Sequence, residues 1–462
     1  MRALQLLLLA ATAACGRSEA VDAAERPSFV VFLTDDQPHD ALGLAGKAPI
    51  ETPNLDALAA RGVRFENAFV TTPVCAVSRA SLLTGQHMGR HGIEDFERPL
   101  SAQQWAETFP ALLRAAGYRT AFLGKYAIGT PGRHDPELCL PAERFDFWYG
   151  FPQQIDYKQF VDGQTVHLTT MLERKAEEFL RSLPADAPFC LIVAFKEPHG
   201  SFNYFDPDVP DAYADSDVPL PATMTPEAFA VQPQCVRESF GAVENVQRWM
   251  DDPSEYVDLM RKSYRAISRA DLAVGRIGAL LGELGLAERT VVVMSSDNGN
   301  LAGAHGLVGK WLMYEESIRV PLIVADPRQP KSARGRASQA MALNIDLAPT
   351  LLSLAGLPVP PRMQGQDLSP LLDDPTAPGR TDWYGEHVFT PQREGPVIPA
   401  SECVRTERWK YVHYLGTEPA VEQLFDLQSD ALEVRDLSAD PAHAETLAQL
   451  RARCAELRAA SR

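Results

Sequence analysis

The chain has 462 residues, of which 45% are hydrophobic and 23% charged, and this composition excludes a disordered or collagen-like chain. Its formal net charge is −17 and it contains no basic run. Nucleic acid is therefore excluded as a partner, because phosphate binding requires clustered Lys and Arg. An anionic ligand must instead be bound by a local cluster of cations.

The first residues resemble an export signal. The first two are followed by LQLLLLAATAAC, an apolar stretch of about a dozen residues, shorter than the roughly 20 that span a bilayer. Small residues precede Cys15 and resemble a bacterial lipobox, in which the cysteine becomes the lipidated first residue. We expect residues 1–15 to be a signal peptide, removed by lipoprotein processing or by plain cleavage. The expected location is the periplasm or the bacterial surface, with a lipid anchor as the only membrane contact.

Short apolar runs rich in β-branched residues predict buried strands: SFVVFLT from Ser28, RTAFLG from Arg119, PFCLIVAF from Pro188, TVVVMSS from Thr290 and RVPLIVADP from Arg319. Amphipathic patterns between them predict helices, for example QQWAETFPALLRAAG from Gln103 and DLMRKSYRAISRADLAVGRIGALLGELG from Asp258. Strands that alternate with helices predict an α/β fold with a large, mostly parallel sheet flanked by helices on both faces.

The segment PVPPRMQGQDLSPLLDDPTAPGR, from Pro358, is rich in proline and charge and predicts the exit from this main domain. Beyond it, ASECVRTERWKYVHY and QLFDLQSD predict short strands, and PAHAETLAQLRARCAELRAA predicts a terminal helix. We expect the main domain to cover residues 27–375 and a small antiparallel α+β domain to cover residues 376–462.

Polar residues follow the predicted strands directly: Asp35 and Asp36, Lys125, Lys196 and His199, and Asp297 and Asn298. In such sheets ligands bind at the carboxyl ends of the strands. Three carboxylates and one amide are hard oxygen ligands that suit calcium or magnesium. Each pair taken alone is also explained by a helix cap or a turn, but both pairs follow buried strands, which favours a metal site.

Cys75 stands just ahead of a helical pattern that stops near Gly85. The N–H groups and positive dipole end of a helix N-terminus favour a reactive sulfur and an anionic ligand. Arg79 lies four residues on, hence on the same helical face. A lone cysteine is also common as a small buried residue, so this pattern alone leaves both interpretations open.

The segment CAVSRASLLTG resembles the sulfatase signature C-x-P-S-R-x-x-L-x-T-G, whose cysteine is oxidised to formylglycine. Further segments resemble sulfatase segments in the same order: VVFLTDDQ, GKYAIG, FKEPHGSF, SSDNGN, HGLVGKWLMYEESIRVPLIV and QLFDLQSDALEVRDLSADP. The similarity covers nearly the whole mature chain. It implies the alkaline phosphatase-like fold and calcium-dependent hydrolysis of sulfate esters.

The resemblance also implies a role for each site residue. It implies that Asp35, Asp36, Asp297 and Asn298 are the calcium ligands and that Cys75 becomes the formylglycine, which Arg79 holds against the metal. It also implies that Lys125 and Lys310 bind the sulfate oxygens and that His199 protonates the departing alcohol. In the family mechanism one hydroxyl of the hydrated aldehyde attacks sulfur and the second expels the sulfate. A divalent ion with two lysines supplies the charge stabilisation that the reaction requires. His305 is expected either to contact substrate or to stabilise its loop.

Two positions depart from the family pattern. Val77 stands where the signature has proline or sometimes alanine, and valine weakens recognition by the converting enzyme without forbidding it. Ala127 in GKYAIG stands where GKWHLG-type members have a histidine that helps to deprotonate the formylglycine hydroxyl. The loss of one acid–base group typically costs about 10²–10⁴-fold in rate. His39 or His91 is the expected replacement if one exists.

The sequence therefore predicts a sulfuric ester hydrolase that removes sulfate from a sulfated carbohydrate, with a formylglycine-generating enzyme as its maturation partner. One alternative is a phosphonate or phosphodiester hydrolase on the same fold. The other, suggested by Val77 and Ala127, is a non-catalytic surface lipoprotein that binds sulfated glycans.

Overall fold

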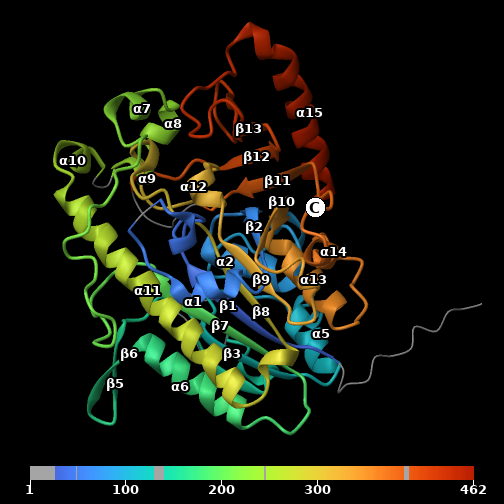
Figure 1. Ribbon diagram of the computed structural model, residues 1–462. Helices are drawn as coiled ribbons and strands as arrows, with labels where there is room; N and C mark the ends of the chain where they lie inside the picture. Colours follow the sequence, from blue (N-terminus) through green and yellow to red (C-terminus); the bar gives the residue numbers. More distant parts are fainter. Residues whose placement is uncertain (1–25, 48, 130–139, 244–245, 390–394) are drawn as a thin grey trace, which may run out of the picture.

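A computed structural model describes residues 26–47, 49–129, 140–243, 246–389 and 395–462 of the chain (Figure 1). The expected signal peptide and Cys15 lie outside the described residues. Within the described part, no helix combines the length and the apolar character that crossing a membrane requires.

The main sheet of the described chain has the strand order β10-β2-β9-β8-β1-β7-β3-β4. Its strands are β1 (Ser28–Asp35), β2 (Val63–Phe69), β3 (Arg119–Lys125), β4 (Phe147–Phe151), β7 (Phe189–Pro198), β8 (Thr290–Ser296), β9 (Leu322–Ala325) and β10 (Arg336–Leu343). Neighbouring strands run parallel except at β9, which is antiparallel to both β2 and β8. The predicted mostly parallel sheet is thus confirmed, with one reversed strand inside it.

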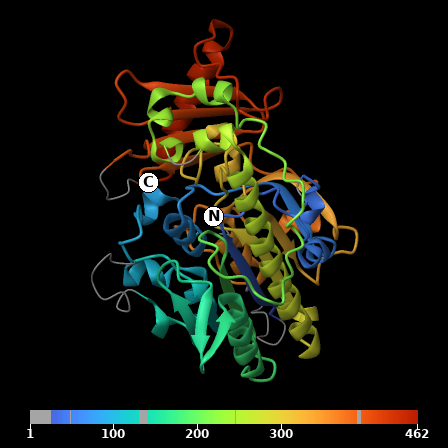
Figure 2. The same ribbon diagram turned by 90° about the vertical axis from the view of Figure 1, so that its left-hand side faces the viewer.

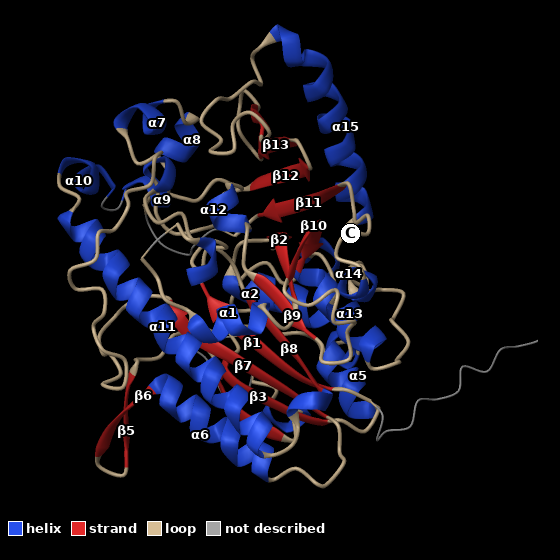
Figure 3. Cartoon of the chain, viewed as in Figure 1, coloured by secondary structure: helices blue, strands red, loops and turns tan. Residues whose placement is uncertain are grey.

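The sheet lies between two layers of helices (Figures 1 and 3). On β1, Phe29, Val31 and Leu33 belong to one core with the apolar residues of α2, α5, α13 and α14, whereas Val30 and Phe32 belong to a second core with α1, α6 and α11. This alternation follows from the two-residue period of a strand. Both faces are covered, which explains why the strand reads as a continuous apolar run.

The helices of these layers and of the loops between them are α1 (Pro53–Ala59), α2 (Cys75–Thr84), α3 (Met88–His91), α4 (Ala102–Ala106), α5 (Phe109–Ala115), α6 (Leu168–Arg181), α7 (Pro226–Ala230), α8 (Gln234–Arg237), α9 (Phe240–Val243), α10 (Val246–Asp251), α11 (Ser254–Glu283), α12 (Glu315–Ile318), α13 (Leu347–Leu354) and α14 (Ser369–Asp373). Short 3-10 turns lie at Gly43–Ala45, Ala142–Arg144, Ala287–Arg289, Ala304–Gly306 and Asn344–Asp346.

The prediction of one continuous helix from Gln103 is wrong in one respect. The segment divides into α4 and α5 because Pro110, which has no N–H to donate, stands in the first turn of the second helix.

A smaller antiparallel sheet of order β11-β12-β13-β14 packs against α15 at the C-terminal end (Figure 2). The elements are β11 (Asp382–His387), β12 (Ser401–Thr406), β13 (Trp409–Tyr414), β14 (Val421–Asp426), a 3-10 turn (Pro441–His443) and α15 (Ala444–Ala460). The expected boundary at residues 375 and 376 falls between α14 and β11. A separate hairpin, β5 (Lys158–Val161) with β6 (Gln164–His167), projects from the main body (Figure 1).

The two sheets are joined by an apolar core and by buried charges. Phe69 of β2 packs with Trp383 of β11, their ring centroids 5.1 Å apart. Lys410 of β13 is fully buried, with its Nζ 2.9 Å from Glu315 Oε1 and 2.6 Å from Glu433 Oε1. Because a buried ammonium requires paired carboxylates, this contact holds α12 against the small sheet.

Candidate active site

The expected metal ligands meet at the carboxyl ends of two adjacent strands. β1 ends at Asp35, and its neighbour β8 ends one residue before Asp297, with Thr34 and Ser296 in register. Asp36 has a φ of 69°, a left-handed conformation that aspartate tolerates better than most residues. Its backbone N–H donates to Asp297 Oδ1 at 3.3 Å. The turn after β1 therefore brings both of its carboxylates to the carboxylate after β8.

The donor set fits a hard divalent cation. One ligand atom from each of Asp35, Asp36, Cys75 and Asp297 lies within 4.8 Å of the others. The three carboxylates are between 0% and 8% exposed, and such a buried group needs compensating positive charge. Asn298 donates through Nδ2 to Asp36 Oδ1 at 2.5 Å, while its buried Oδ1 has no hydrogen-bond partner. A free amide oxygen beside three carboxylates is a set of oxygen donors that suits calcium or magnesium.

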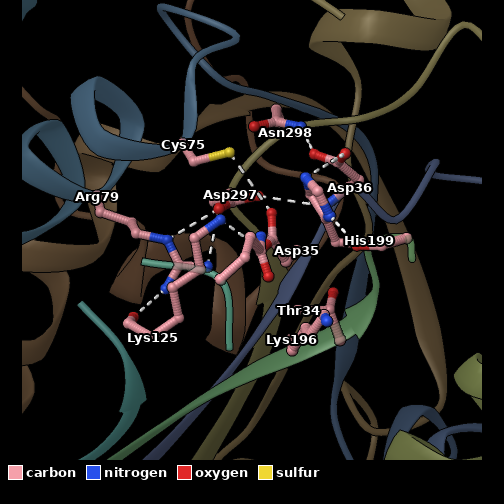
Figure 4. A network of polar contacts seen from close by, with 12 residues as sticks. Thr34, Asp35, Asp36, Cys75, Arg79, Lys125, Lys196, His199, Asp297 and Asn298 are labelled. Atoms are coloured by element: carbon pink, nitrogen blue, oxygen red, sulfur yellow. Dashed lines mark hydrogen bonds and ion pairs between the residues drawn. The ribbon is translucent and has the colours of Figure 1, made fainter. Parts of the chain in front are cut away.

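Three cationic side chains contact the carboxylates, and Figure 4 shows two of them, Arg79 and Lys125. Arg79 Nε donates to Asp297 Oδ2 at 2.8 Å, and Nη1 of the same guanidinium donates to the Lys125 carbonyl. Lys125 Nζ lies 2.5 Å from Asp35 Oδ2, and Lys310 Nζ donates to Asp36. Three cations thus face three carboxylates, so the cluster is close to neutral before a metal binds.

The buried charges shift one another's protonation. Burial alone would raise the pKa of Asp35, but Lys125 and the other nearby cations outweigh it and hold that pKa well below its usual value. Burial and the nearby Asp35 raise the pKa of Asp297 despite the guanidinium of Arg79. Burial opposes the charge on Lys310, yet Asp36 raises its pKa well above the ordinary value. Burial likewise opposes the charge on Lys125, but Asp35 raises its pKa, so both lysines are held as cations at the floor of the site.

Cys75 is the first residue of α2 and is 2% exposed. Its Sγ lies 3.5 Å from Asp35 Oδ1 and accepts a hydrogen bond from Lys310 Nζ at 2.9 Å (Figure 4 shows the contact with Asp35). Burial raises the pKa of the thiol to about 12, although Lys125 and Lys310 lower it in part. An unmodified Cys75 is thus a neutral thiol near pH 7, and since the thiolate is the nucleophile, it is poorly reactive.

His199 follows β7 and faces the cluster (Figure 4). Its Nε2 lies 3.8 Å from Asp36 Oδ2, and its Nδ1 lies 2.5 Å from the Gly200 carbonyl. Because a carbonyl only accepts, Nδ1 carries the hydrogen, and Nε2 is the nitrogen that can exchange a proton. Tyr157 Oη donates to the His199 carbonyl at 2.9 Å, which fixes the backbone at this point.

A cavity of about 400 Å³ opens over Cys75. Its walls consist of Cys75, Phe96, Glu97, Lys125, Gln153, Gln154, His199, Lys310, Trp311 and Phe389. Sequence reasoning found four of these residues and missed the three aromatic residues, Glu97 and both glutamines. No pattern in the sequence marks them, because they come from loops that only the fold brings together.

Neither histidine expected to replace the one missing at Ala127 lines this cavity. His91 is 1% exposed, its Nδ1 accepts from the Ile93 N–H at 3.0 Å, and its Nε2 lies 3.0 Å from Ser81 Oγ. Burial lowers the pKa of His91 to about 3 and that of His39 to about 4. Both rings are thus neutral near pH 7 and outside the cavity lining, and the contacts of His91 are structural.

Two further residues have structural surroundings. His305 is fully buried, with its ring stacked on Tyr314 at 4.2 Å and its Nε2 3.4 Å from Glu316 Oε2. Of the two roles expected for His305, these contacts favour stabilisation of its loop. Val77 packs with Val74 and Met88 beneath the aromatic side of the cavity.

Comparison with known proteins decides the family. The family model described as Sulfatase matches residues 27–357, well over half of the chain. The chain belongs to the sulfatase family. A second family model, described as N-sulphoglucosamine sulphohydrolase, C-terminal, matches residues 303–460 of this sulfatase. The predicted family, and with it the classification as an enzyme, is confirmed.

Two curated relatives cover most of this sulfatase. An ulvan-active sulfatase from Formosa agariphila is 30% identical over 447 residues, which are 92% of this chain and 79% of that protein. An N-acetylglucosamine-6-O-sulfatase from Bacteroides thetaiotaomicron is 27% identical over 483 residues, covering 89% of this chain and 83% of its own.

Solved structures agree with the fold. A structure described as a complex with its substrate D-glucosamine-2-N,6-O-disulfate has a TM-score of 0.82 and 24% identity, covering 94% of this sulfatase and 98% of that chain. A phosphonate monoester hydrolase of Agrobacterium radiobacter has a TM-score of 0.79 and 23% identity, covering 95% and 96%. At these identities the likeness shows the shared architecture alone.

Proposed function

We propose that this sulfatase removes sulfate from a sulfated carbohydrate, using calcium and a formylglycine derived from Cys75. One observation carries the proposal: Cys75 begins a helix at the floor of a cavity, within 4.8 Å of three carboxylates and in contact with Lys310. The curated relatives named for sulfated N-acetylglucosamine and for ulvan support a carbohydrate as the substrate.

The residues have separable roles in this proposal. Asp35, Asp36, Asp297 and Asn298 would hold the cation, which supplies charge stabilisation for the sulfate oxygens when bound. Formylglycine at position 75 supplies, once hydrated, a nucleophilic hydroxyl and a second hydroxyl for product release. Lys125 and Lys310 bind the non-bridging oxygens, where negative charge grows during the reaction. Their contacts with Asp35 and Asp36 place both ammonium groups beside the metal site.

The remaining residues position the site or protonate the leaving group. Arg79 fixes Asp297 and the Lys125 backbone, so it holds the start of α2 against the metal site. His199 Nε2 donates its proton to the departing alcohol oxygen, and the bond from Nδ1 to Gly200 keeps the ring in the required orientation. Phe96, Trp311 and Phe389 offer apolar surfaces on which the ring of a sugar can pack.

Processing and location complete the proposal. Conversion of Cys75 requires a formylglycine-generating enzyme as a partner, and the N-terminal signal directs the protein to the periplasm or to the bacterial surface. A lipid on Cys15 would anchor it there.

Conversion of Cys75 and turnover of a sulfate ester together test the proposal. When the protein is made beside its native maturation system, the tryptic peptide of residues 65–79 should contain an aldehyde at position 75, as measured by mass spectrometry with aldehyde trapping. The same preparation should hydrolyse an aryl sulfate faster than an aryl phosphodiester or phosphonate. A reversed preference would support the phosphonate or phosphodiester alternative, and tight glycan binding with an unmodified thiol and no turnover would support the binding protein.

The Ala127→His variant tests whether the missing acid–base group limits the rate of sulfate ester hydrolysis. Ala127 is fully buried with a φ of 67°, a conformation in which histidine is enriched among non-glycine residues. We expect kcat to rise, by at most about 10²–10⁴-fold, with little change in KM. The extra volume should lower the free energy of unfolding by about 1–3 kcal/mol. Ala127→Asn is the matched control, because asparagine also tolerates this φ but carries no base; an equal gain in both variants would contradict the interpretation.

A further inference from the structure

Gln154 contacts the site but has no assigned role. It lies in the loop that leaves β4, three residues after Phe151, which pairs with Lys125 at the end of β3. The Tyr126 N–H donates to the Phe151 carbonyl at 2.9 Å, so the chain segments that carry Ala127 and Gln154 leave the sheet side by side. An amide side chain therefore stands next to the segment from which the family histidine is missing.

The orientation of the Gln154 amide is determined by its partner. Its Nε2 lies 2.6 Å from Asp35 Oδ2, the oxygen that also contacts Lys125. Because the ion-paired carboxylate only accepts hydrogen bonds, the amide must present its N–H group to Asp35. The opposite atom, Oε1, is then the free end of the side chain.

The free end of Gln154 lacks a partner. Oε1 is buried and accepts no hydrogen bond, although the side chain lines the same cavity as Cys75. A buried carbonyl oxygen without a donor is costly, so a group brought by the working site is expected to satisfy it. Sulfate oxygens only accept, which excludes them as that group. A hydroxyl at position 75 is a donor, and Cys75 Sγ contacts the other oxygen of the same Asp35 carboxylate at 3.5 Å.

We propose that Gln154 is a positioning residue for the nucleophile: its Nε2 is held by Asp35, and its Oε1 accepts a hydrogen bond from a hydroxyl of the hydrated formylglycine at position 75. The inference rests on the proposed conversion of Cys75. An amide oxygen is too weak a base to remove the proton, so Gln154 orients the hydroxyl without replacing the missing histidine as a base. In hydration, water adds to the aldehyde carbon, one water proton moves to the carbonyl oxygen, and only the diol formed carries donors.

The hydrate-to-aldehyde ratio tests this assignment without relying on turnover. In converted protein, Gln154→Met retains the length of the side chain but removes both the acceptor and the N–H that donates to Asp35, so the free aldehyde fraction should rise. An aminooxy probe reacts with the aldehyde and not with its hydrate. It should label folded Gln154→Met protein roughly two- to tenfold faster than the wild type, which is the range expected for one net hydrogen bond. Conversion is first measured by mass spectrometry, so that rates refer to equal amounts of formylglycine.

Gln153→Met is the matched control, because Gln153 lines the same cavity but makes no described hydrogen bond. Its labelling rate should stay close to that of the wild type. Equal labelling of Gln154→Met and the wild type, or an equal increase in both variants, would overturn the inference. If Gln154→Met does not fold, Gln154→Leu is judged by the same rates. Wild-type protein without aldehyde would overturn the proposed function, and this inference with it; aldehyde with unchanged labelling overturns the inference alone.

Discussion

Replacing Cys75 by serine is expected to lower steady-state turnover of an aryl sulfate by about 10⁴-fold or more, as the loss of a catalytic nucleophile does in other hydrolases. Serine supplies one hydroxyl but no second hydroxyl to expel sulfate. If its oxygen attacks, the bond from sulfur to the alcohol breaks, the alcohol leaves with a proton from His199, and a sulfated serine remains. Mass spectrometry of the peptide covering residues 65–79 should then show a gain of one SO₃ unit.

A cysteine outside the site separates this effect from the general consequences of the substitution. Cys235 in α8 is half-buried and does not line the cavity, so Cys235→Ser should retain turnover. Sustained turnover by Cys75→Ser at the wild-type rate would contradict the formylglycine mechanism. A protein that carries only thiol at position 75 and is equally active would contradict it too, because burial keeps that thiol protonated.

The parts of the fold that could be predicted are those with a strong local signal. β1, β3, β7 and β8 are continuous apolar runs because helices cover both faces of the sheet. Such runs can be recognised as strands from the sequence alone. β2 and β10 could not be predicted, because polar residues interrupt the apolar pattern: those of VRFENAF are partly buried, and Arg336 and Gln339 of RASQAMAL are exposed. The antiparallel direction of β9 could not be predicted, because it depends on how the chain enters the sheet and not on the four residues of the strand.

The same distinction applies to the site. Residues placed directly after predicted strands, such as Asp35 and Asp297, could be expected to meet, because the ends of parallel strands share one edge. Cys75 was correctly expected at a helix start, and α2 ends at Gly85, whose φ of 65° suits a glycine cap. Gln154 could not be expected, since β4 was not predicted and its contact with Asp35 spans 119 residues of chain.

Asp297→Ala should remove the metal and destabilise the fold together, because this carboxylate is both a proposed ligand and the partner of Arg79. Both side chains are at most 3% exposed, and two guanidinium nitrogens lie 2.8 Å from Asp297 Oδ2. Removing one member of a buried ion pair leaves the other charge unpaired, which costs about 3–5 kcal/mol of unfolding free energy. Chemical denaturation should measure that loss, and elemental analysis should find less bound calcium than in the wild type.

An exposed ion pair provides the control for Asp297→Ala. Asp208 pairs with Arg276 at 3.0 Å, but the two side chains are 58% and 40% exposed, so Asp208→Ala should cost less than about 1 kcal/mol. Calcium should raise the melting temperature of the wild type and of Asp208→Ala, since an ion that binds only the folded state stabilises it. The melting temperature of Asp297→Ala should not respond to calcium. A full equivalent of calcium in Asp297→Ala, with an unchanged thermal response, would exclude Asp297 as a ligand and leave it a structural role, through its contacts with Arg79 and the Asp36 N–H.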